Sequence, residues 1–371
     1  MWLRFKQIGW AFLLVVLVPT HAIAVTAQVV ANGLVHPWAV TFIGDGKMLV
    51  TERAGSLRLI GSDGSISEPI KGLPKIAAQR QGGLLDLIVD RDFARNRMIY
   101  FCYSRPDPDR SGFNSTALAS ARLSENETSL QNVRDLFVQS PSYQGGFHFG
   151  CRIVEGADGT LWMGLGDRYQ LMQDAQNTAN EIGKVIRVRK DGSLPADNPF
   201  ASRTGASTAI WSFGHRNIQG ATLDGQGRLW MTEHGPQGGD ELNLIRPGVN
   251  YGWPVITYGV NYGGGQIGDG ITSAPGMEQP VVQWTPSIAP SGLAYLDTVR
   301  YGPSWQGNLL LGSLKFGYLV RLALDGDRVV GQEIVLPELG QRVRDVRLGP
   351  DGLVYVLTDS PNGQLLRLTP D

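Results

Sequence analysis

One histidine in this sequence stands where it could serve as a base beside a bound ligand. His148 lies in the stretch GGFHFG at 145–150, and Asp167 follows nineteen residues later in GLGDR. If the two residues flank one β-hairpin, the carboxylate can fix the imidazole tautomer and leave the other ring nitrogen free as a base. The surrounding glycines would allow a ligand to approach closely. The alternative is a core histidine whose polar atoms are satisfied, and these residues alone leave both interpretations open.

Basic and amide side chains recur near turns of the chain, at similar points in a repeated unit. These side chains are Gln81, Arg216, Asn217, Lys315, Arg342 and Arg344. A single arginine at a strand edge is usually a solvated or ion-paired surface group, so each residue alone is a weak signal. Several cations that converge would suit a small ligand with more than one carboxylate or phosphate.

The stretch EHGPQGGDE at 233–241 combines acidic side chains with a glycine-rich turn. Glu233, Asp240 and Glu241 supply carboxylates and the turn supplies carbonyl groups, a mixture that suits Ca²⁺. The spacing differs from that of an Asp-x-Asp-x-Asp calcium loop, so a metal site and an ordinary turn both remain open. The sequence has no thiol–imidazole cluster for zinc and no GxSxG, HExxH or P-loop motif. It also lacks a dinucleotide motif, so NAD is not expected.

Positioning these residues requires a fold that brings many turns together, and the sequence repeats one unit six times. Each unit contains short runs rich in Val, Ile, Leu and Tyr between DG, NG or GQG turns, which is typical of β-hairpins. The six units begin at Ala39, Gly82, Gly150, Gly220, Ser291 and Arg344. A β-sandwich does not repeat an internal unit six times. The pattern therefore predicts an all-β fold, a six-bladed β-propeller whose loops meet at one end of a central channel.

The first 24 residues have the features of a secretory signal peptide. Arg4 and Lys6 precede an apolar run, and the tripeptide AIA at 22–24 fits a signal-peptidase site. An uncleaved membrane anchor is the alternative, and no other segment is apolar enough to span a bilayer. The sequence predicts a signal peptide at 1–24 and one propeller domain at 25–371. The protein would be periplasmic or secreted, with no stable membrane insertion after cleavage.

Charge and cysteine content narrow the expected partners. Without residues 1–24 the net charge changes from −1 to −3, because Arg4 and Lys6 are lost and no acidic residue is. This balance does not favour nucleic acid or an anionic membrane surface as a partner. Cys102 and Cys151 could pair in an exported protein. Their spacing does not show that they lie within bonding distance, and two buried free thiols are the favoured interpretation.

Five longer motifs together resemble one family. They are QGGLLDL, FHFGCRIVEGADGTLWMGLGDR, GHRNIQG, TEHGPQGGDELNLIRPGVNYGWP and RVRDVRLGPDGLVYVLTD. In these motifs the sequence closely resembles the soluble PQQ-dependent aldose sugar dehydrogenases of the glucose/sorbosone dehydrogenase family. The resemblance extends from about Val30 to Pro370, and the block 214–254 is its most specific part. It implies a six-bladed propeller that holds pyrroloquinoline quinone (PQQ), a flat tricarboxylate quinone, over the central channel.

The resemblance implies oxidation of an aldose sugar at its C1 hydroxyl to the lactone. His148 would be the general base for that hydroxyl, and the C1 hydride would pass to PQQ. Asp167 would orient His148, and Arg216 would stabilise the negative charge that grows on the quinone oxygen. The cofactor would be held by Gln81, Arg216, Asn217, Tyr262, Leu314, Lys315, Arg342 and Arg344. The electrons would then pass to an external acceptor such as a quinone, a dye or a cytochrome.

The resemblance also implies calcium. The carbonyls of Gly235 and Pro236 would bind a catalytic Ca²⁺ that polarises the quinone. Glu241 and the carbonyl of Tyr251 match a second, structural calcium site. One departure is Cys151, where many relatives have glycine. The insertion at 255–290 gives no firm match beyond Tyr262, so the cofactor residues are better supported than the sugar specificity. The expected oligomeric state is a monomer or a homodimer.

Two other functions would use a similar scaffold. A calcium-dependent propeller lactonase needs a carboxylate-rich centre, whereas the predicted centre is cationic and contains His148. A non-catalytic propeller that binds a sugar or a protein partner has no need of His148 together with the cofactor-binding arginines. We therefore predict a PQQ-dependent dehydrogenase and keep these two functions as alternatives.

Overall fold

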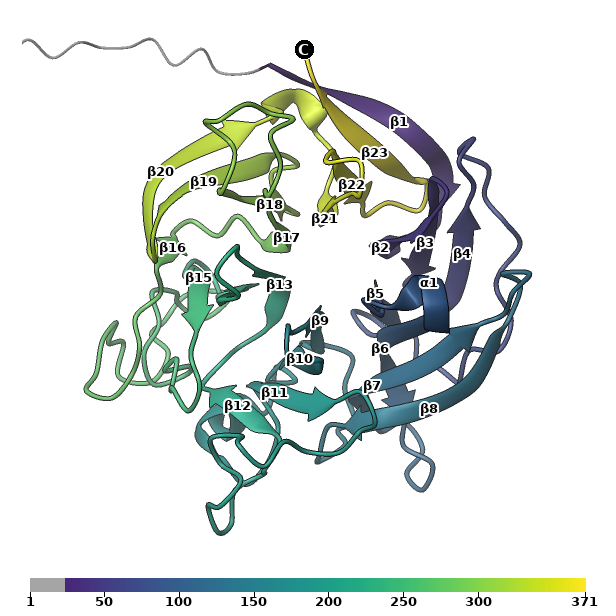
Figure 1. The fold of residues 1–371 in the computed structure, drawn as a ribbon. Helices are drawn as coiled ribbons and strands as arrows, with labels where there is room; N and C mark the ends of the chain where they lie inside the picture. The colour runs from purple at the N-terminus through teal and green to yellow at the C-terminus, as the bar shows by residue number, and fades with distance from the viewer. Residues whose placement is uncertain (1–23) are drawn as a thin grey trace, which may run out of the picture.

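The strands of this chain form a closed ring. The computed structural model describes residues 24–371, in which six antiparallel sheets surround a central channel (Figure 1). The predicted all-β, six-bladed propeller is confirmed. Of the predicted signal peptide, only Ala24 lies within the described residues. In the part of the chain that the structure describes, no helix has the length and apolar character needed to cross a membrane.

We number the six sheets as blades in the chain order of their innermost strands. Blade 1 contains β2 (Pro37–Gly44), β3 (Lys47–Glu52) and β4 (Ser56–Ile60). Blade 2 contains β5 (Leu84–Val89), β6 (Met98–Pro106), β7 (Asn114–Leu123) and β8 (Leu130–Val138). Blade 3 contains β9 (Gly150–Glu155), β10 (Thr160–Leu165), β11 (Lys184–Arg189) and β12 (Ile210–Phe213).

The remaining blades follow the same order. Blade 4 contains β13 (Ile218–Leu223), β14 (Leu229–Glu233), β15 (Asp240–Ile245) and β16 (Val282–Trp284). Blade 5 contains β17 (Pro290–Tyr295), β18 (Leu309–Ser313), β19 (Leu319–Asp325) and β20 (Arg328–Val335). Blade 6 contains β21 (Val343–Leu348), β22 (Val354–Thr358), β23 (Gly363–Pro370) and β1 (Val25–Leu34). Short helices lie in connecting segments: α1 (Phe93–Asn96), η1 (Met172–Gln176) and η2 (Pro337–Leu339).

Blade 6 closes the ring by pairing strands from the two ends of the domain. β1 runs antiparallel to β23, from Val25 opposite Pro370 to Leu34 opposite Gly363. The repeats identified in the sequence begin at Ala39, so they do not reveal this pairing. The closure replaces two exposed strand edges with one row of backbone hydrogen bonds.

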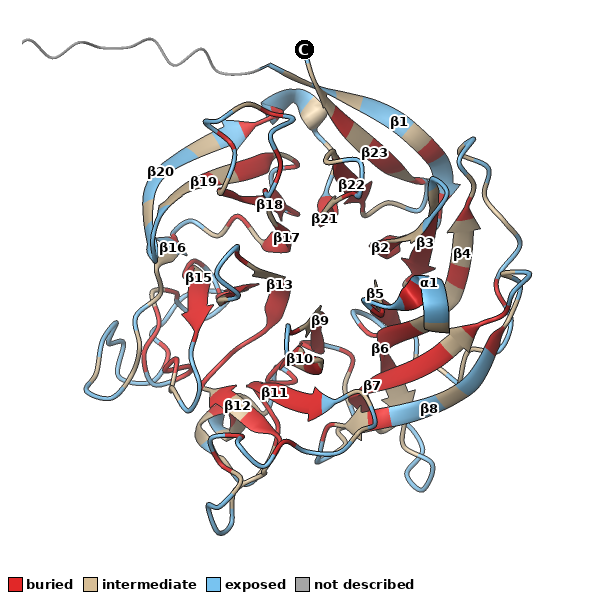
Figure 2. Cartoon of the chain, viewed as in Figure 1, coloured by how far each residue is buried: buried red, intermediate tan, exposed pale blue. Residues whose placement is uncertain are grey.

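The outermost strands of several blades are more exposed than the strands inside them (Figure 2). The inner strand β17 is buried along nearly its whole length, whereas the outer strand β20 of the same blade is mostly exposed. The apolar side chains of adjacent blades pack face to face, and the largest cluster runs from blade 1 through blade 2 to blade 3. The hydrophobic cores between blades therefore hold the inner strands in fixed positions around the channel.

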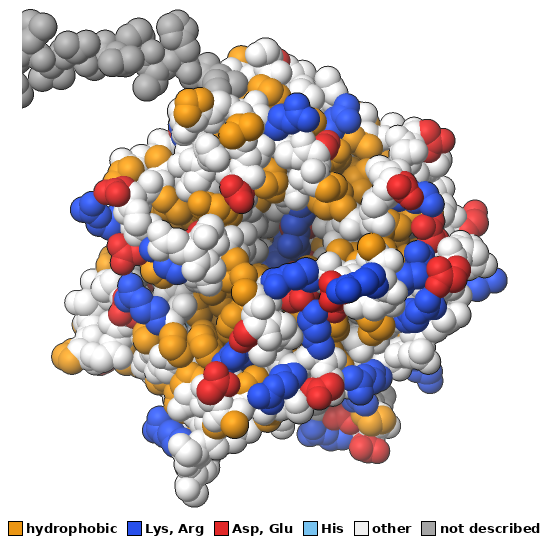
Figure 3. All heavy atoms as spheres, in the orientation of Figure 1, with side chains coloured by type: hydrophobic (Ala, Val, Ile, Leu, Met, Phe, Trp, Pro, Cys, Tyr) orange, Lys and Arg blue, Asp and Glu red, His pale blue; other side chains and the backbone are white. Residues whose placement is uncertain are grey.

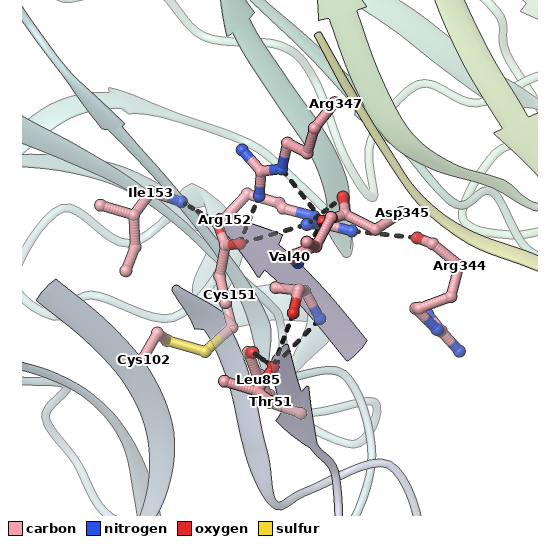
Figure 4. A network of polar contacts seen from close by, with 12 residues as sticks. Val40, Thr51, Leu85, Cys102, Cys151, Arg152, Ile153, Arg344, Asp345 and Arg347 are labelled. Carbon is pink, nitrogen blue, oxygen red and sulfur yellow. Dashed lines mark hydrogen bonds and ion pairs between the residues drawn. A yellow bond between two sulfur atoms is a disulfide. The ribbon is translucent and has the colours of Figure 1, made fainter. Parts of the chain in front are cut away.

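Four charged side chains meet inside the channel (Figure 4). Arg152 of β9 lies 3.2 Å from Asp86 of β5 and 2.8 Å from Asp345 of β21. Arg347 pairs with the same two carboxylates, and its Nε lies 3.0 Å from Asp345. The carboxylates also accept backbone N–H groups, including that of Val40 in blade 1 at 3.1 Å. Two positive and two negative charges thus balance within one network.

The channel opens at two ends. Residues at the ends of the inner strands, among them Val89, Val154, Leu223, Tyr295 and Leu348, line one opening of about 330 Å³. The loops at the other end carry most of the polar residues singled out from the sequence, and several of these loops precede inner strands. Figure 3 shows a hollow at the centre of one face, with hydrophobic side chains around it and Lys or Arg side chains within it.

The two cysteines form a disulfide, so the interpretation as free thiols is wrong. Cys102 of β6 and Cys151 of β9 are bonded, and their Cα atoms lie 5.8 Å apart. The bond links blade 2 to blade 3. Spacing along the sequence could not reveal it, because the distance between the two cysteines depends on how neighbouring blades pack.

Candidate active site

Loops at one end of the blades enclose one continuous cleft. It comprises three cavities of about 740, 140 and 200 Å³. His234, Leu314 and Arg342 line both the first and the second cavity. Pro236 and Tyr262 line both the first and the third. These shared walls make the three cavities parts of a single site.

Most of the predicted site residues line this cleft. They are Gln81, His148, Asp167, Arg216, Asn217, Gly235, Pro236, Tyr262, Leu314, Lys315, Arg342 and Arg344. Glu241 and Tyr251, which the resemblance assigns to a structural calcium site, do not contribute to the lining of these cavities. The propeller thus gathers into one cleft residues that are scattered over most of the chain.

His148 and Asp167 lie at the same end of the hairpin formed by β9 and β10. Nδ1 of His148 lies 2.6 Å from Oδ1 of Asp167. The indole Nε1–H of Trp253 donates to Oδ2 of the same carboxylate at 2.8 Å. The backbone N–H of His148 donates to Oε1 of Gln81 at 2.9 Å. The histidine is therefore held through both its ring and its backbone.

Burial keeps His148 neutral. The residue is 6% exposed, and burial lowers the pKa of its imidazole below the ordinary value of 6.5. The hydrogen bond to Asp167 acts in the opposite direction, while the positive charges of Arg216 and Arg168 lower this pKa further. Nδ1–H then donates to Asp167, and no described residue hydrogen-bonds to Nε2. Because the ring lines the 200 Å³ cavity, Nε2 is available to take a proton from a ligand there.

Arg216 is fixed beside the His148–Asp167 pair, mainly by backbone groups. Its Nη1 donates to the carbonyl oxygens of His234 at 2.9 Å and Gly235 at 2.7 Å. Its own backbone N–H donates to Oε2 of Glu233 at 2.6 Å. The guanidinium lies 5.2 Å from the ring of Trp253, the residue that also binds Asp167. The guanidinium of Arg216 therefore places a positive charge in the cleft at a nearly fixed position.

A second buried arginine, Arg344, lines the 140 Å³ cavity. Arg344 donates through Nη2 to Asp359 at 2.8 Å and through Nη1 to Oε1 of Gln219 at 3.2 Å. Burial acts to raise the pKa of Asp359, but Arg344 outweighs it and holds that pKa well below its usual range. Gln219 in turn donates to Oδ1 of Asn217 at 3.3 Å, which accepts the N–H of Gly150 at 3.2 Å. One polar network thus connects blades 3, 4 and 6.

Three predicted residues form the rim of the cleft. Arg342 donates to the carbonyl of Leu314 at 3.0 Å. Lys315 is exposed, and its ammonium lies 5.0 Å from the ring of Phe316. Tyr262 is 62% exposed and stands on the insertion that follows β15. Their side chains can move to meet a ligand more freely than Arg216 or Arg344 can.

Sequence reasoning did not single out four residues that the cleft uses. They are Gln219, His234, Trp253 and Asp359. All four lie within the quoted motifs: Gln219 in GHRNIQG, His234 in TEHGPQGG, Trp253 in NYGWP, and Asp359 at the end of RVRDVRLGPDGLVYVLTD. The motifs therefore carried a signal, but which of their side chains face the channel depends on the register of each blade.

Two of the acidic residues at 233–241 are used within the protein. Glu233 lies 2.9 Å from Nδ1 of His215. Asp240 accepts the backbone N–H groups of Gly235 at 2.8 Å and Ala289 at 2.7 Å. These carboxylates brace the turn that carries Gly235 into the cleft. Within residues 24–371, no three His, Cys, Asp or Glu side chains are grouped as a metal cluster.

Glu241 has the environment of a carboxylate that lacks a counter-charge. Burial and the neighbouring Glu233 raise the pKa of Glu241 to about 8, and its carboxylate accepts a hydrogen bond from Asn243 at 3.0 Å. Tyr251 stacks on His215 of the same region, with ring centroids 4.7 Å apart. A cation beside Glu241 would favour its ionised form, so these side chains are compatible with a calcium ion.

The cleft fits a planar molecule with several carboxylates. The Nε atoms of Arg216 and Arg344 are buried and have no hydrogen-bond partner among the described residues. A buried donor without a partner costs about 1–3 kcal/mol, which a carboxylate ligand would offset. Pro236, Val260 and Leu314 give the 740 Å³ cavity apolar walls. These features match the charge and the flat ring system of PQQ.

Comparison with known proteins agrees with this geometry. The glucose/sorbosone dehydrogenase family matches residues 34–367. The aldose sugar dehydrogenase YliI of Escherichia coli is 41% identical over 349 residues, which are 93% of each chain. The crystal structure of the soluble aldose sugar dehydrogenase of Escherichia coli in the apo-form has a TM-score of 0.90 and 40% identity, over 94% of this chain and 100% of that one.

A more distant solved structure carries a bound quinone. The PQQ-bound form of aldose sugar dehydrogenase from Streptomyces coelicolor is 27% identical, with a TM-score of 0.76, over 94% of this chain and 99% of that one. The family match covers most of the described propeller, and the two Escherichia coli matches cover 93% and 94% of this chain. On these grounds the chain belongs to the glucose/sorbosone dehydrogenase family.

Proposed function

We propose that this protein oxidises aldose sugars at the C1 hydroxyl to the lactone, with PQQ as the hydride acceptor. The observation that carries the proposal is the buried His148–Asp167 pair, whose free Nε2 shares a cleft with the fixed guanidinium of Arg216. The names of the Escherichia coli and Streptomyces coelicolor relatives support the same activity. When bound, PQQ would supply the quinone that takes the hydride from C1.

Residues of the chain transfer the proton, hold the base in place and stabilise the developing charge. Nε2 of His148 takes the proton of the C1 hydroxyl, and Asp167 stabilises the imidazolium that forms. Trp253 keeps the carboxylate of Asp167 in place through its indole N–H. Arg216 holds a positive charge close to the dyad, where negative charge develops during the reaction. Because the walls are buried, little water surrounds these groups and their electrostatic effect is strong.

The cofactor and its metal would be held by groups at the rim and floor of the cleft. Arg344, Arg342 and Lys315 would bind carboxylates, while Gln81, Asn217, Tyr262 and Leu314 would contact the ring system. The carbonyls of Gly235 and Pro236 would bind a catalytic Ca²⁺. The carbonyl of Gly235 also accepts a hydrogen bond from Arg216. Because Ca²⁺ takes about 6–8 oxygen ligands, most of the ligands of this ion would have to come from other molecules. Glu241 and the Tyr251 carbonyl would hold the second Ca²⁺.

The location of the enzyme and its electron acceptor complete the proposal. Residues 1–24 would direct export, so the enzyme would act in the periplasm or outside the cell, as a monomer or a homodimer. An external acceptor such as a quinone, a dye or a cytochrome would take up the electrons at the open side of the cleft.

The test is a reconstitution of the purified protein. We expect dye reduction by a panel of aldoses only when PQQ and CaCl₂ are both added. His148→Ala should lower kcat by about 10²–10⁴-fold and leave the binding of PQQ, measured by its absorbance, near that of the wild type. Arg95→Ala, at the exposed helix α1, is the control and should keep full activity. Absence of both PQQ binding and turnover in the wild type would remove the proposal and favour a non-catalytic propeller.

A further inference from the structure

The segment that carries His148 has an unusual backbone. His148, Gly150 and Cys151 adopt φ values of 49°, 67° and 82°. Glycine accepts such a conformation readily, whereas a residue with a Cβ does so at a cost of about 1–3 kcal/mol. Strained backbone of this kind persists only where surrounding contacts fix it. The position of His148 therefore depends on what holds residues 148–151.

Every residue of this segment is contacted from another part of the protein. The N–H of His148 donates to Gln81, and the N–H of Gly150 donates to Asn217. The carbonyl of Phe149 accepts the hydroxyl of Thr116 at 3.0 Å. Cys151 has the covalent contact, its disulfide to Cys102 (Figure 4). The ring of His148 also binds Asp167, and its carbonyl accepts the N–H of Arg168 at 3.2 Å. Hydrogen bonds and one covalent bond thus fix the segment.

Cys151 is also the extra residue of a β-bulge. In the pairing of β9 with β10, Arg152 lies opposite Gly164 and Gly150 lies opposite Leu165, so Cys151 has no partner. A bulge redirects the chain, and it is one residue away from an alternative register. Cys102 lies opposite Leu118 in the regular pairing of β6 with β7, and beside the register shift of β5 between Leu84 and Leu87. The disulfide therefore attaches the unpaired residue of blade 3 to β6, a strand that is paired on both sides within blade 2.

We infer that the Cys102–Cys151 disulfide is a positioning device for His148, because it fixes the bulge from which the histidine segment departs. This inference rests on the proposed role of His148. Both cysteines are fully buried, so the bond lies inside the protein between the two blades. Without it, the left-handed conformation of Cys151 would lose its strongest support. His148 would then shift relative to Asp167, although the fold around it would remain.

The two cysteines offer variants that separate the bond from the backbone. Cys102→Ala removes the disulfide and leaves a side chain on the strained residue. Cys151→Gly removes the same bond but replaces the residue with one that adopts a φ of 82° without strain. If the disulfide acts through the bulge, Cys102→Ala should disturb His148 more than Cys151→Gly does. If the disulfide only stabilises the fold, both variants should lower the melting temperature and leave His148 in place.

The first readout is the titration of the His148 ring, followed by NMR in the protein without PQQ or sugar. The chain has five histidines, and the His148 signal can be assigned by its loss in His148→Gln. The groups that influence this titration are Asp167, Arg216 and Arg168, and the charge of His148 acts in turn on the imidazole of His234. In the wild type the midpoint should lie below 6.5. In Cys102→Ala it should move upward toward 6.5, with a smaller movement in Cys151→Gly.

The second readout is steady-state kinetics with PQQ, CaCl₂ and an aldose. Cys102→Ala should lower kcat by about tenfold or more with little change in KM, because a base displaced by less than 1 Å loses much of its effect. An unchanged His148 titration in folded Cys102→Ala would overturn the inference. If Cys102→Ala does not fold, Cys151→Gly is used instead, once a chemical assay confirms that the disulfide is absent. An unchanged His148 titration and an unchanged kcat in Cys151→Gly would then overturn the inference as well. The NMR result does not depend on turnover, so it separates this inference from the proposed function.

Discussion

The imidazole of His148 shows how the properties of one side chain are set by its neighbours. Burial lowers its pKa below 6.5, and Asp167 opposes this effect through a 2.6 Å hydrogen bond. A base must be neutral to accept a proton, so the active fraction falls as the pH drops through this pKa. Because the pKa is lowered, the acidic limb of the kcat–pH profile should lie below pH 6.5.

Asp167→Asn tests this balance at the scale of the residue. Loss of the carboxylate removes the group that favours the imidazolium, so the pKa of His148 should fall further and the acidic limb should move to lower pH. The asparagine cannot stabilise the imidazolium, so kcat should fall by about 10²-fold or more. The measurement is kcat from pH 4 to 8 with saturating PQQ and CaCl₂.

Asp269→Asn provides the matched control for this variant. Asp269 is exposed on the insertion that follows β15, and the substitution there should leave the profile in place. An acidic limb that stays unchanged in Asp167→Asn, or moves to higher pH, would contradict the electrostatic role assigned to Asp167.

The sequence could predict the His148–Asp167 contact because both residues belong to one hairpin. The strands β9 and β10 are adjacent in the chain, so their flanking residues must lie at the same end of the blade. The role of Trp253 could not be predicted in this way, because it reaches Asp167 from an insertion 86 positions away. The disulfide was misjudged for a similar reason, since Cys102 and Cys151 lie in different blades.

Among the elements, the segment between β10 and β11 contributes most to one wall of the cleft. Tyr169, Gln170 and Met172 line the same cavity as His148. Lys184, the first residue of β11, is fully buried, and its ammonium donates to the carbonyls of Asp174 at 2.8 Å, Ala175 at 3.0 Å and Ile182 at 2.5 Å. Its three N–H groups therefore match three carbonyls around helix η1. The buried side chain of Lys184 therefore holds this wall of the cleft in place.

Lys184→Met should loosen this wall because it removes all three donors and keeps a similar shape. We expect the free energy of unfolding to fall by about 3 kcal/mol, since three buried carbonyls lose their partners. KM for the sugar should rise more than kcat falls, because the loosened residues line the cavity and His148 stays bound to Asp167.

Lys71→Met is the control for that variant, because Lys71 is exposed and lies outside the cleft. It should leave both the urea unfolding curve and the KM unchanged. Equal KM values for Lys184→Met and the wild type would show that Lys184 does not position the sugar-facing wall.

At the scale of the element, turn chemistry made the blades predictable. DG and GQG turns separate strand pairs at regular intervals, and each of the six units begins at or near an inner strand. β1 could not be assigned to blade 6 from the sequence, because its partner lies at the other end of the domain. Such pairing depends on closure of the ring and leaves no local signal.

For the whole molecule, the charge network in the channel connects most of the blades. Arg152 contacts Asp86 in blade 2, the carbonyl of Gln219 in blade 4 and Asp345 in blade 6. It also lies 4.1 Å from the ring of Trp38 in blade 1. Because its charge is matched within the network, the arginine can be buried without an isolated charge.

Arg152→Met should destabilise the propeller strongly. The substitution leaves two buried carboxylates with one arginine, and such an unbalanced site costs about 3–5 kcal/mol. Urea unfolding followed by tryptophan fluorescence would measure this loss. Arg328→Met, which removes an exposed ion pair with Asp325, is the comparison and should change stability by less than about 1 kcal/mol. A similar midpoint for both variants would show that the network does not hold the blades together.

The closure of blade 6 also determines when the fold can be completed during synthesis of the chain. β1 leaves the ribosome long before β23, its hydrogen-bonding partner, and the contact between Thr26 and Asp371 spans 345 positions. Until synthesis reaches residue 370, β1 has an unpaired edge, and such edges are prone to pair with other chains. Contacts between distant segments also form slowly, since a long loop must close first. The blades can begin to form one after another during synthesis, but the complete ring waits for its last strand, and the cleft that needs residues from blade 6 waits with it.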